Sequence, residues 1–295
     1  ASTWMRWSMR RSASASSPEM IKQDHEFWDW YTKRLTANPR FERDVVARKT
    51  FSKLRSAIAG LYAFRRIYDE SEYAFKQAIA LYPLSPEANF RLADIYMQQF
   101  RFSDARVIIE AFLKEDPEND KVAEFLVQIR DMETADARRR ELEGKMSQGA
   151  DINLALELAD IYRRMNLGQL FEGLTMSIVR QDNLPPQVLL KVAEMHASVQ
   201  RYDLLATTLE RYLQKEPSNP RVWIDLAAAH ATLQRSKEAL AALRKAVELG
   251  GEPVRDIARK DRRFESIRET PDFKALVPPV QARLDLPMNL QLPGL

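Results

Sequence analysis

The sequence has no cysteine, and only 8 of its 295 residues are glycine and 3 are histidine. A chain without cysteine can form neither a disulfide nor a thiolate metal site. The three histidines have no spacing typical of metal ligands, and alternating runs of Val, Ile and Thr are missing. These absences argue against strands, against a metal centre and against a bound cofactor.

Motifs that carry catalysis are missing as well. Gly250-Gly251 has neither the spacing nor the lysine of the GxxxxGK[ST] loop that binds nucleotide phosphates. No nucleophile elbow is present, and the many carboxylates are interpreted as solvated helix faces rather than as an acid/base pair. We therefore do not expect an enzyme.

Positive and negative charges nearly balance. The formal net charge is +3 at pH 7, and basic and acidic residues are interspersed along the chain. A nucleic-acid-binding protein would need a basic stripe, so nucleic acid is not an expected partner. No stretch approaches the roughly 18 consecutive apolar residues that a membrane span needs.

The most informative feature of the sequence is a pair of adjacent segments of equal length. Residues 186–219 and 220–253 are both 34 residues long, and each has an apolar helical pattern, a turn after Gln200 or Gln234, and a second apolar helical pattern. A helix pair of this length cannot bury its own apolar face, so it must stack on neighbouring pairs. The pattern predicts an all-α solenoid.

The same register organises most of the chain. We expect a flexible tail over 1–18, an N-terminal helical cap over 19–51, about six helix pairs over 52–253, a C-terminal helical cap over 254–276 and an extended tail over 277–295. The irregular stretch 120–151 is expected to be a helix pair whose second, strongly polar member is exposed. The apolar spacing from Phe41 to Leu61 predicts one long helix that runs into the first pair.

These residues resemble the tetratricopeptide repeat. The pattern of that family is matched in 220–253 by a large residue, Trp223, by Leu226, and by small residues at Ala227, Ala239 and Ala246. The segment departs from it at His230, where an aromatic residue is usual, and at Gly251, where proline is usual. The resemblance covers about two-thirds of the chain and implies a right-handed α-α superhelix that binds a protein or a peptide.

The resemblance also implies a binding surface, because certain first-helix positions of such repeats line a concave groove. Carried over to this sequence, these positions are Phe64, Phe90, Asp94, Met97, Asp160, Arg163, Arg164, Leu190, Glu194 and Ile224. Some family members grip a peptide's carboxylate with an asparagine where Asp94, Asp160 and Glu194 stand here. Acidic residues would repel a carboxylate, so we expect an extended or helical segment instead.

Two alternatives for these groove positions stay open. Several of the side chains can simply pack against the next repeat. The groove can also be filled by the chain's own tail, in which Leu284, Leu286, Met288 and Leu290 are apolar. His196 and His230, which share one repeat position, are expected to pack against a neighbouring helix rather than to sense pH or bind a ligand.

A looser resemblance concerns the N-terminal part. Residues 24–28 and 46–63 look like the soluble tails of bacterial membrane proteins similar to protein O-mannosyltransferases. This implies an alternative function as an accessory or regulatory region of a larger, membrane-tethered glycosyltransferase-like protein of the cell envelope. The chain begins at Ala1 without a methionine, and Trp and Arg residues gather over 4–11, so a piece of a longer chain that lies near a membrane is an expectation.

Overall fold

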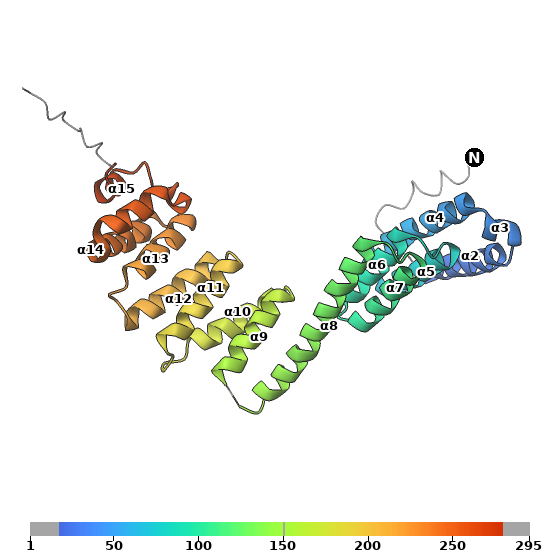
Figure 1. Cartoon of the computed structure of the whole chain (residues 1–295), viewed down its shortest axis with the longest axis horizontal. Coiled ribbons are helices and arrows are strands. Elements are labelled where there is room, and N and C mark those ends of the chain that lie inside the picture. Colours follow the sequence, from blue (N-terminus) through green and yellow to red (C-terminus); the bar gives the residue numbers. More distant parts are fainter. Residues whose placement is uncertain (1–17, 150, 280–295) are drawn as a thin grey trace, which may run out of the picture. The chain divides into compact units, whose positions relative to one another are not determined.

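The computed structural model describes residues 18–149 and 151–279, and every regular element in these ranges is helical (Figure 1). No helix in these ranges combines the length and the apolar character needed to span a membrane. The chain divides into two compact units, unit 1 up to Arg140 and unit 2 from Glu141 onward. Each unit is described by itself.

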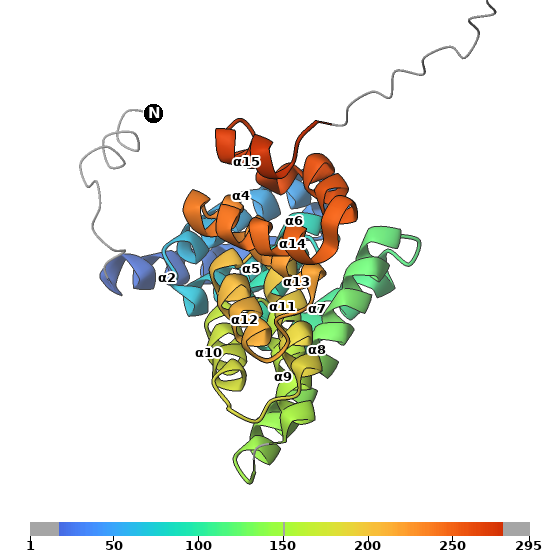
Figure 2. The ribbon, with the colours of Figure 1, turned by 90° about the vertical axis from the view of Figure 1, so that its left-hand side faces the viewer.

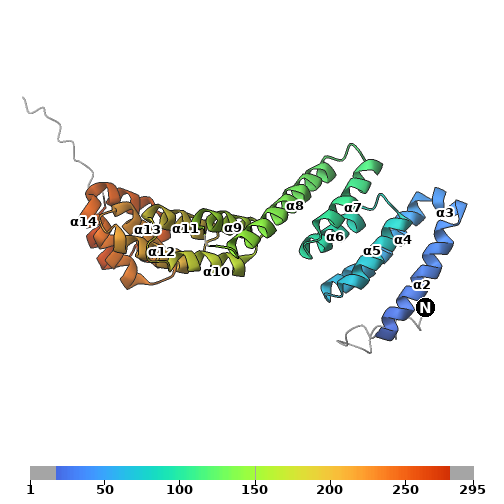
Figure 3. The same ribbon diagram turned by 90° about the horizontal axis from the view of Figure 1, so that it is seen from below.

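Unit 1 contains two helix pairs and the helices before them. Its elements are α2 (Pro18–Thr36), α3 (Pro39–Arg43), α4 (Val45–Phe64), α5 (Tyr68–Leu81), α6 (Pro86–Gln98), α7 (Phe102–Glu115) and the first part of α8 (Asp120–Met146). Figure 3 shows α2 and α3 at one end of this unit, followed by α4 with α5 and then α6 with α7. The α4 helix packs on α5 and also on α6, as the stacking of repeats requires.

Unit 2 contains three helix pairs and a C-terminal cap. The pairs are α9 (Ile152–Arg164) with α10 (Gly168–Val179), α11 (Pro186–Ser198) with α12 (Tyr202–Lys215), and α13 (Pro220–Thr232) with α14 (Ser236–Lys260). The backbone of α14 is non-helical at Gly251. The short helices η1 (Arg262–Phe264) and α15 (Pro271–Leu276) follow, and α15 lies beside α14 (Figure 2).

Local sequence explains where the helices begin and how closely they pack. Ser85 accepts a hydrogen bond from the backbone of Ala88 and Pro86 takes the first helical position; Asn219 and Pro220 do the same for α13. The repeats are numbered from residues 52, 86, 152, 186 and 220. The eighth residue of each repeat is small and buried in all five pairs, which lets the helices approach closely. These residues are Ala59, Ala93, Ala159, Ala193 and Ala227.

The turn between the two helices of a pair uses the same backbone conformation in every repeat. The fifteenth residue has a positive φ of 56° to 60° in all five pairs. These residues are Arg66, Phe100, Asn166, Gln200 and Gln234. Only asparagine among them is a type that favours this conformation, so the turn is imposed by the packing of the helices that it joins.

The stretch 120–151 differs from its prediction. It forms one continuous helix, α8, rather than a helix pair with an exposed second member. Charged residues one turn apart hold the polar half helical, since Asp136 pairs with Arg139 and Arg140, and Lys145 pairs with Glu141. Leu142 in this half is fully buried.

The predicted long helix near the N-terminus is also shorter than expected. Phe41 belongs to the separate helix α3, and α4 begins at Val45 because the Asp44 side chain accepts a hydrogen bond from the backbone of Ala47. At the other end, Phe264, Ile267 and Phe273 are buried. The expectations for residues 1–17, which include 4–11, and for 280–295, with Leu284 to Leu290, lie outside the described residues.

Candidate protein-interaction surfaces

The eleventh residue of each repeat reaches back to the helix that stands in the place of the preceding second helix. Tyr62 donates to Asp24 of α2 (3.1 Å), Tyr96 to Glu72 of α5 (2.9 Å) and Tyr162 to Glu143 of α8 (2.9 Å). The ring Nε2 atoms of His196 and His230 lie 2.9 Å from Thr175 Oγ1 and 3.4 Å from Glu210 Oε1. These bonds place α2 and the C-terminal part of α8 where a second helix stands. The N-terminal part of α8 packs on the core of unit 1 through Val122, Leu126 and Ile129.

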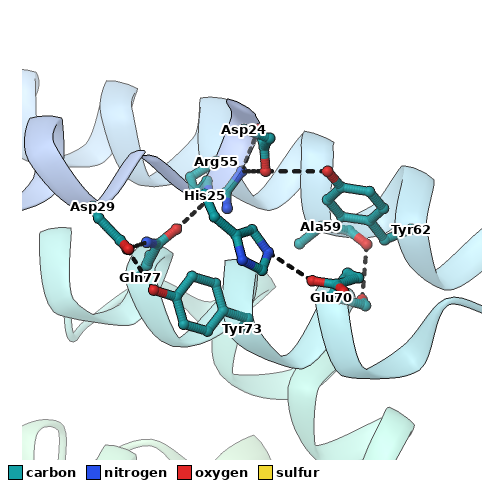
Figure 4. Close-up of polar contacts among 10 residues, drawn as sticks. Asp24, His25, Asp29, Arg55, Ala59, Tyr62, Glu70, Tyr73 and Gln77 are labelled. Carbon is teal, nitrogen blue, oxygen red and sulfur yellow. Dashed lines mark hydrogen bonds and ion pairs between the residues drawn. The ribbon is translucent and has the colours of Figure 1, made fainter. Parts of the chain in front are cut away.

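A buried charge fixes α2 in this place (Figure 4). The guanidinium of Arg55 is fully buried, lies 2.8 Å from Asp24 Oδ2 and donates to Gln77 Oε1 at 2.8 Å. It also lies 5.0 Å from the centre of the Trp28 ring. Burial and the neighbouring Asp24 carboxylate raise the pKa of Tyr62 to about 12, so its hydroxyl remains a donor.

Two further contacts along α2 continue this polar seam. His25 stacks on Tyr73 with ring centres 4.3 Å apart, and its Nε2 lies 2.6 Å from Glu70 Oε2. Asp29 accepts hydrogen bonds from Tyr73 (2.5 Å) and Gln77 (2.6 Å). Asp29, Tyr73 and Gln77 thus pair with one another and attach α2 to α5, whereas the buried Nη2 of Arg55 has no hydrogen-bond partner among the described residues.

In unit 1, the predicted groove residues fall into two kinds. Phe64 is 87% exposed at the end of α4, and Asp94 is exposed on α6. Phe90 and Met97 are half-buried and pack against the core, and the Phe90 ring lies 5.2 Å from that of Phe125. Phe90 and Met97 therefore follow the alternative in which the side chains at groove positions pack against the protein's own core.

In unit 2, three predicted residues form one ion-pair cluster at the end of α9. Arg163 lies 2.6 Å and Arg164 lies 3.3 Å from the two carboxylate oxygens of Asp160. All three side chains are at least partly exposed. The single carboxylate leaves this cluster with a surplus of positive charge.

Two other predicted residues, Leu190 and Glu194 on α11, line a hollow of about 300 Å³ between α11 and α13. Its apolar lining comes from Leu190, Ala193, Ala197, Leu205, Leu209 and Val222, and its polar lining from Glu194, Asn219, Arg221, Asp225 and Arg263. Apolar walls with a few polar groups of both signs are typical of a site that takes a peptide side chain.

The polar side of this hollow is arranged by the C-terminal cap. Arg263 from η1 lies 2.6 Å from Asp261 and reaches Asp225 of α13 at 3.2 Å. Burial alone would raise the pKa of Asp261, but hydrogen bonds from Arg263 hold this pKa below its ordinary value. The cap thus holds a guanidinium and a carboxylate at the edge of the hollow.

The prediction that Ile224 lines the groove is wrong. Its side chain is only 2% exposed, so it presents no surface to a groove. The C-terminal cap is the reason, since η1 packs against α13 and Ser266 donates to the carbonyl of Ala231. Asp225 and Arg263 were not predicted for the site. Arg263 lies beyond the last repeat, where the register that located the other positions has ended.

The histidine at the eleventh position makes stability depend on pH. His196 is fully buried between Thr175 and Thr208, and burial lowers its pKa to about 4 against the opposing effect of Asp203. Unfolded histidine titrates near 6.5, so the unfolded chain takes up this proton first as pH falls. The free energy of unfolding should therefore drop by about 2 kcal/mol between pH 8 and pH 5.

Urea unfolding of the wild-type chain and of His196→Gln at several pH values checks this expectation. The variant has no imidazole at this site, so its free energy of unfolding should depend less on pH between 6.5 and 5. Carboxylates with a lowered pKa, such as Asp203, reduce the free energy of unfolding only at lower pH, so they do not affect the window between pH 6.5 and pH 5. Equal slopes for the two proteins would contradict the assignment.

The fold and these surfaces define a helix-pair repeat protein. Tetratricopeptide-repeat patterns match residues 68–129 and, separately, residues 198–252. The chain therefore contains tetratricopeptide repeats and has the predicted all-α superhelical fold. The family is generally a non-enzymatic scaffold that binds proteins or peptides. No curated protein matches the sequence, and neither match addresses the resemblance to proteins similar to O-mannosyltransferases, which stays a prediction.

The solved structures similar to this chain include two that are described as TPR proteins. YrrB, described as a TPR protein with an unusual peptide-binding site, is 12% identical, with 78% of this chain and 98% of that chain covered and a TM-score of 0.31. The C-terminal part of a TPR repeat-containing protein from Cytophaga hutchinsonii is 14% identical, with 77% and 96% covered and a TM-score of 0.33. The MamA protein is 13% identical, with 71% and 95% covered and a TM-score of 0.29.

Proposed function

We propose that this chain is a scaffold that binds a segment of a protein partner in the hollow between α11 and α13. The observation that carries the proposal is the composition of that hollow, in which an apolar floor meets two arginines and two carboxylates at the edge. An apolar side chain of the partner would fill the floor, and polar groups beside it would bind the edge.

The charges at the edge favour an internal segment over a free C-terminus. Glu194 and Asp225 face the hollow beside Arg221 and Arg263, so the edge has no surplus of positive charge to hold a terminal carboxylate. An extended or helical segment has no such charge along its backbone and can present one basic and one acidic side chain to the two signs at the edge.

The test begins with selection of binders from a displayed library of 12-residue peptides on the full chain. We expect the selected peptides to bind at least tenfold more weakly to the variant Glu194→Lys/Arg221→Glu, because it reverses two charges at the edge. Both side chains are exposed, so folding should be preserved. Fluorescence anisotropy with labelled peptides measures the change.

Arg244→Glu is the matched control, since Arg244 is an exposed arginine on α14 that does not line the hollow. Its affinity for the selected peptides should stay within about twofold of the wild-type value. Selected peptides that bind the double variant and the wild-type chain equally well would overturn this location of the site.

A further inference from the structure

The last helix pair has a second hollow, on a side of α13 that the hollow between α11 and α13 does not use. It holds about 480 Å³ and is lined by residues of α12, α13 and α14. Trp223, Leu226 and His230 come from α13, and their spacing of three and four residues puts them on one stripe of that helix. The two hollows have no lining residue in common.

The surroundings of His196 show what an imidazole at the eleventh position of a repeat needs. Its Nε2 and Nδ1 atoms lie 2.9 Å and 3.1 Å from the hydroxyl oxygens of Thr175 and Thr208. Thr175 belongs to α10, the preceding second helix, and Thr208 belongs to α12, the second helix of the same pair. Both nitrogens of this fully buried ring are therefore satisfied by the protein itself.

The imidazole of His230, one repeat later, lacks both hydroxyls. Leu209 and Ala242 stand at the two equivalent positions. The Nε2 atom lies 3.4 Å from Glu210 of α12 instead, and Nδ1 has no hydrogen-bond partner in the described part of the chain. Because Nε2 points to the preceding second helix in both repeats, Nδ1 points to the second helix of its own pair, on which Ala242 stands. His230 is only 5% exposed, and both it and Ala242 line the hollow.

The unpartnered Nδ1 atom is an acceptor. Burial lowers the pKa of His230 against the opposing effect of Glu210, so the ring is neutral near pH 7. A neutral imidazole has one ring proton, and Nε2 carries it, because the neighbouring carboxylate can only accept. A buried acceptor without a donor is unfavourable, and a donor that enters the hollow would relieve it.

The rim of this hollow is acidic. Glu210 on α12 and Glu238 on α14 line it from two helices, and both side chains are exposed. Its lining includes a single cation, Lys245, which lies 2.8 Å from the carboxylate of Glu248. Arg235 is near enough to affect the pKa of His230 but does not line the hollow. We call this site the acidic hollow.

The carboxylates of the acidic hollow are not part of the repeat pattern. In the preceding repeat, Met176 stands at the position of Glu210 and Leu204 at the position of Glu238. The helices of that repeat pack without a carboxylate at either position, so the stack does not require them. Two carboxylates beside a partly buried tryptophan are instead typical of a site for a cation.

We propose that the acidic hollow binds an arginine side chain of a protein partner. The guanidinium lies against the Trp223 ring and donates to Glu210 and Glu238 on its two sides. The indole Nε1 already donates to the carbonyl of Pro217 at 2.8 Å, which holds the ring in place and leaves its π-system for the cation. The site stands whatever the hollow between α11 and α13 binds, because the two hollows have no lining residue in common.

The chemistry of the lining favours arginine over other ligands. A guanidinium is flat and has five N–H donors, enough for two carboxylates and a bare ring nitrogen, whereas the ammonium of lysine is compact and strongly hydrated. No group of three His, Asp or Glu side chains among the described residues is placed to hold a metal ion. Phosphates of a nucleic acid or of a membrane would be repelled by the two carboxylates.

The probe is a capped five-residue peptide with one central arginine between alanines. It is titrated into the full chain labelled with nitrogen-15, and the indole N–H signal of Trp223, assigned with Trp223→Phe, follows binding. We expect a saturable shift of this signal. The dissociation constant should rise at least fivefold in Glu210→Gln/Glu238→Gln, because both charges that hold the guanidinium are lost. Both side chains are exposed, so folding should be preserved.

Three controls make the result specific. A peptide with citrulline has nearly the shape of the probe but no charge, and it should bind at least fivefold more weakly. A peptide with lysine should bind at least threefold more weakly, because its ammonium does not stack on the indole. The variant Glu216→Gln/Glu265→Gln removes two exposed carboxylates of unit 2 that do not line the hollow, and its affinity should stay within twofold of wild type.

Several outcomes would overturn the proposal. These are no saturable shift in the wild-type chain, equal affinity in Glu210→Gln/Glu238→Gln, and equal affinity for the citrulline or the lysine peptide. A tenfold gain in affinity on deletion of residues 280–295, which include Arg283, would assign the hollow to the chain's own tail instead of a partner. Glu194→Lys/Arg221→Glu should bind the arginine peptide as the wild type does, so this proposal and the proposed function can fail separately.

Discussion

Asp24→Ala should destabilise the attachment of α2 to unit 1 by about 3–5 kcal/mol, because it leaves the buried guanidinium of Arg55 without its carboxylate. Arg55 would retain one hydrogen bond to Gln77 and the face of Trp28, which do not neutralise its charge. Detachment of α2 would return the guanidinium to water, so the cost cannot exceed the free energy of that detachment. Hydrogen exchange of the α2 amides measures the free energy of detachment in the wild-type chain and in the variant.

The control for this prediction is Asp29→Ala on the same helix. Asp29 is exposed and accepts only from Tyr73 and Gln77, so its loss should cost less than about 1 kcal/mol. The double variant Asp24→Leu/Arg55→Met removes both charges and should recover most of the protection of α2. Loss of less than 1 kcal/mol in Asp24→Ala would show that α2 is not held by this pair.

The sequence predicts the helix pairs well because their packing depends on residues at fixed intervals. Ala93 and Ala227 are small where two helices touch, and this requirement repeats every 34 residues whatever the partner. The pattern does not reveal α8, whose polar half is helical through pairs such as Asp136 with Arg140. Hydrophobic periodicity carries no information about such a helix.

The candidate site could be predicted only in part. Leu190 and Glu194 follow from the repeat register, and they line the hollow in unit 2. Ile224 occupies an equivalent position, but the C-terminal cap buries its helix face, and the cap has no repeat pattern of its own. The repeat register does not locate Arg263 either, because this residue lies in the cap and reaches the hollow from η1. Contacts made by the ends of a solenoid are specific to each chain.

Phe75→Ala should reduce the stability of unit 1 by about 3–5 kcal/mol, because it removes a fully buried ring from the centre of its core. Phe75 packs in one cluster with Ala59, Leu92 and Tyr96, so the cavity would lie where α4, α5 and α6 meet. These backbones are already in close contact through small residues and cannot move inward to fill the space. Urea unfolding followed by hydrogen exchange of the α5 amides reports on unit 1 separately from unit 2.

Phe64→Ala is the matched control, since it makes the same chemical change at a side chain that is 87% exposed on the neighbouring helix. Its effect should stay within about 0.5 kcal/mol, because no cavity forms and little apolar area changes its environment. If Phe64→Ala cost as much as Phe75→Ala, Phe64 would have to be covered in solution, and the end of α4 could not be an accessible surface. A small effect at Phe75 would instead show that the stack of α4 on α5 and α6 is loose enough to collapse around the missing ring.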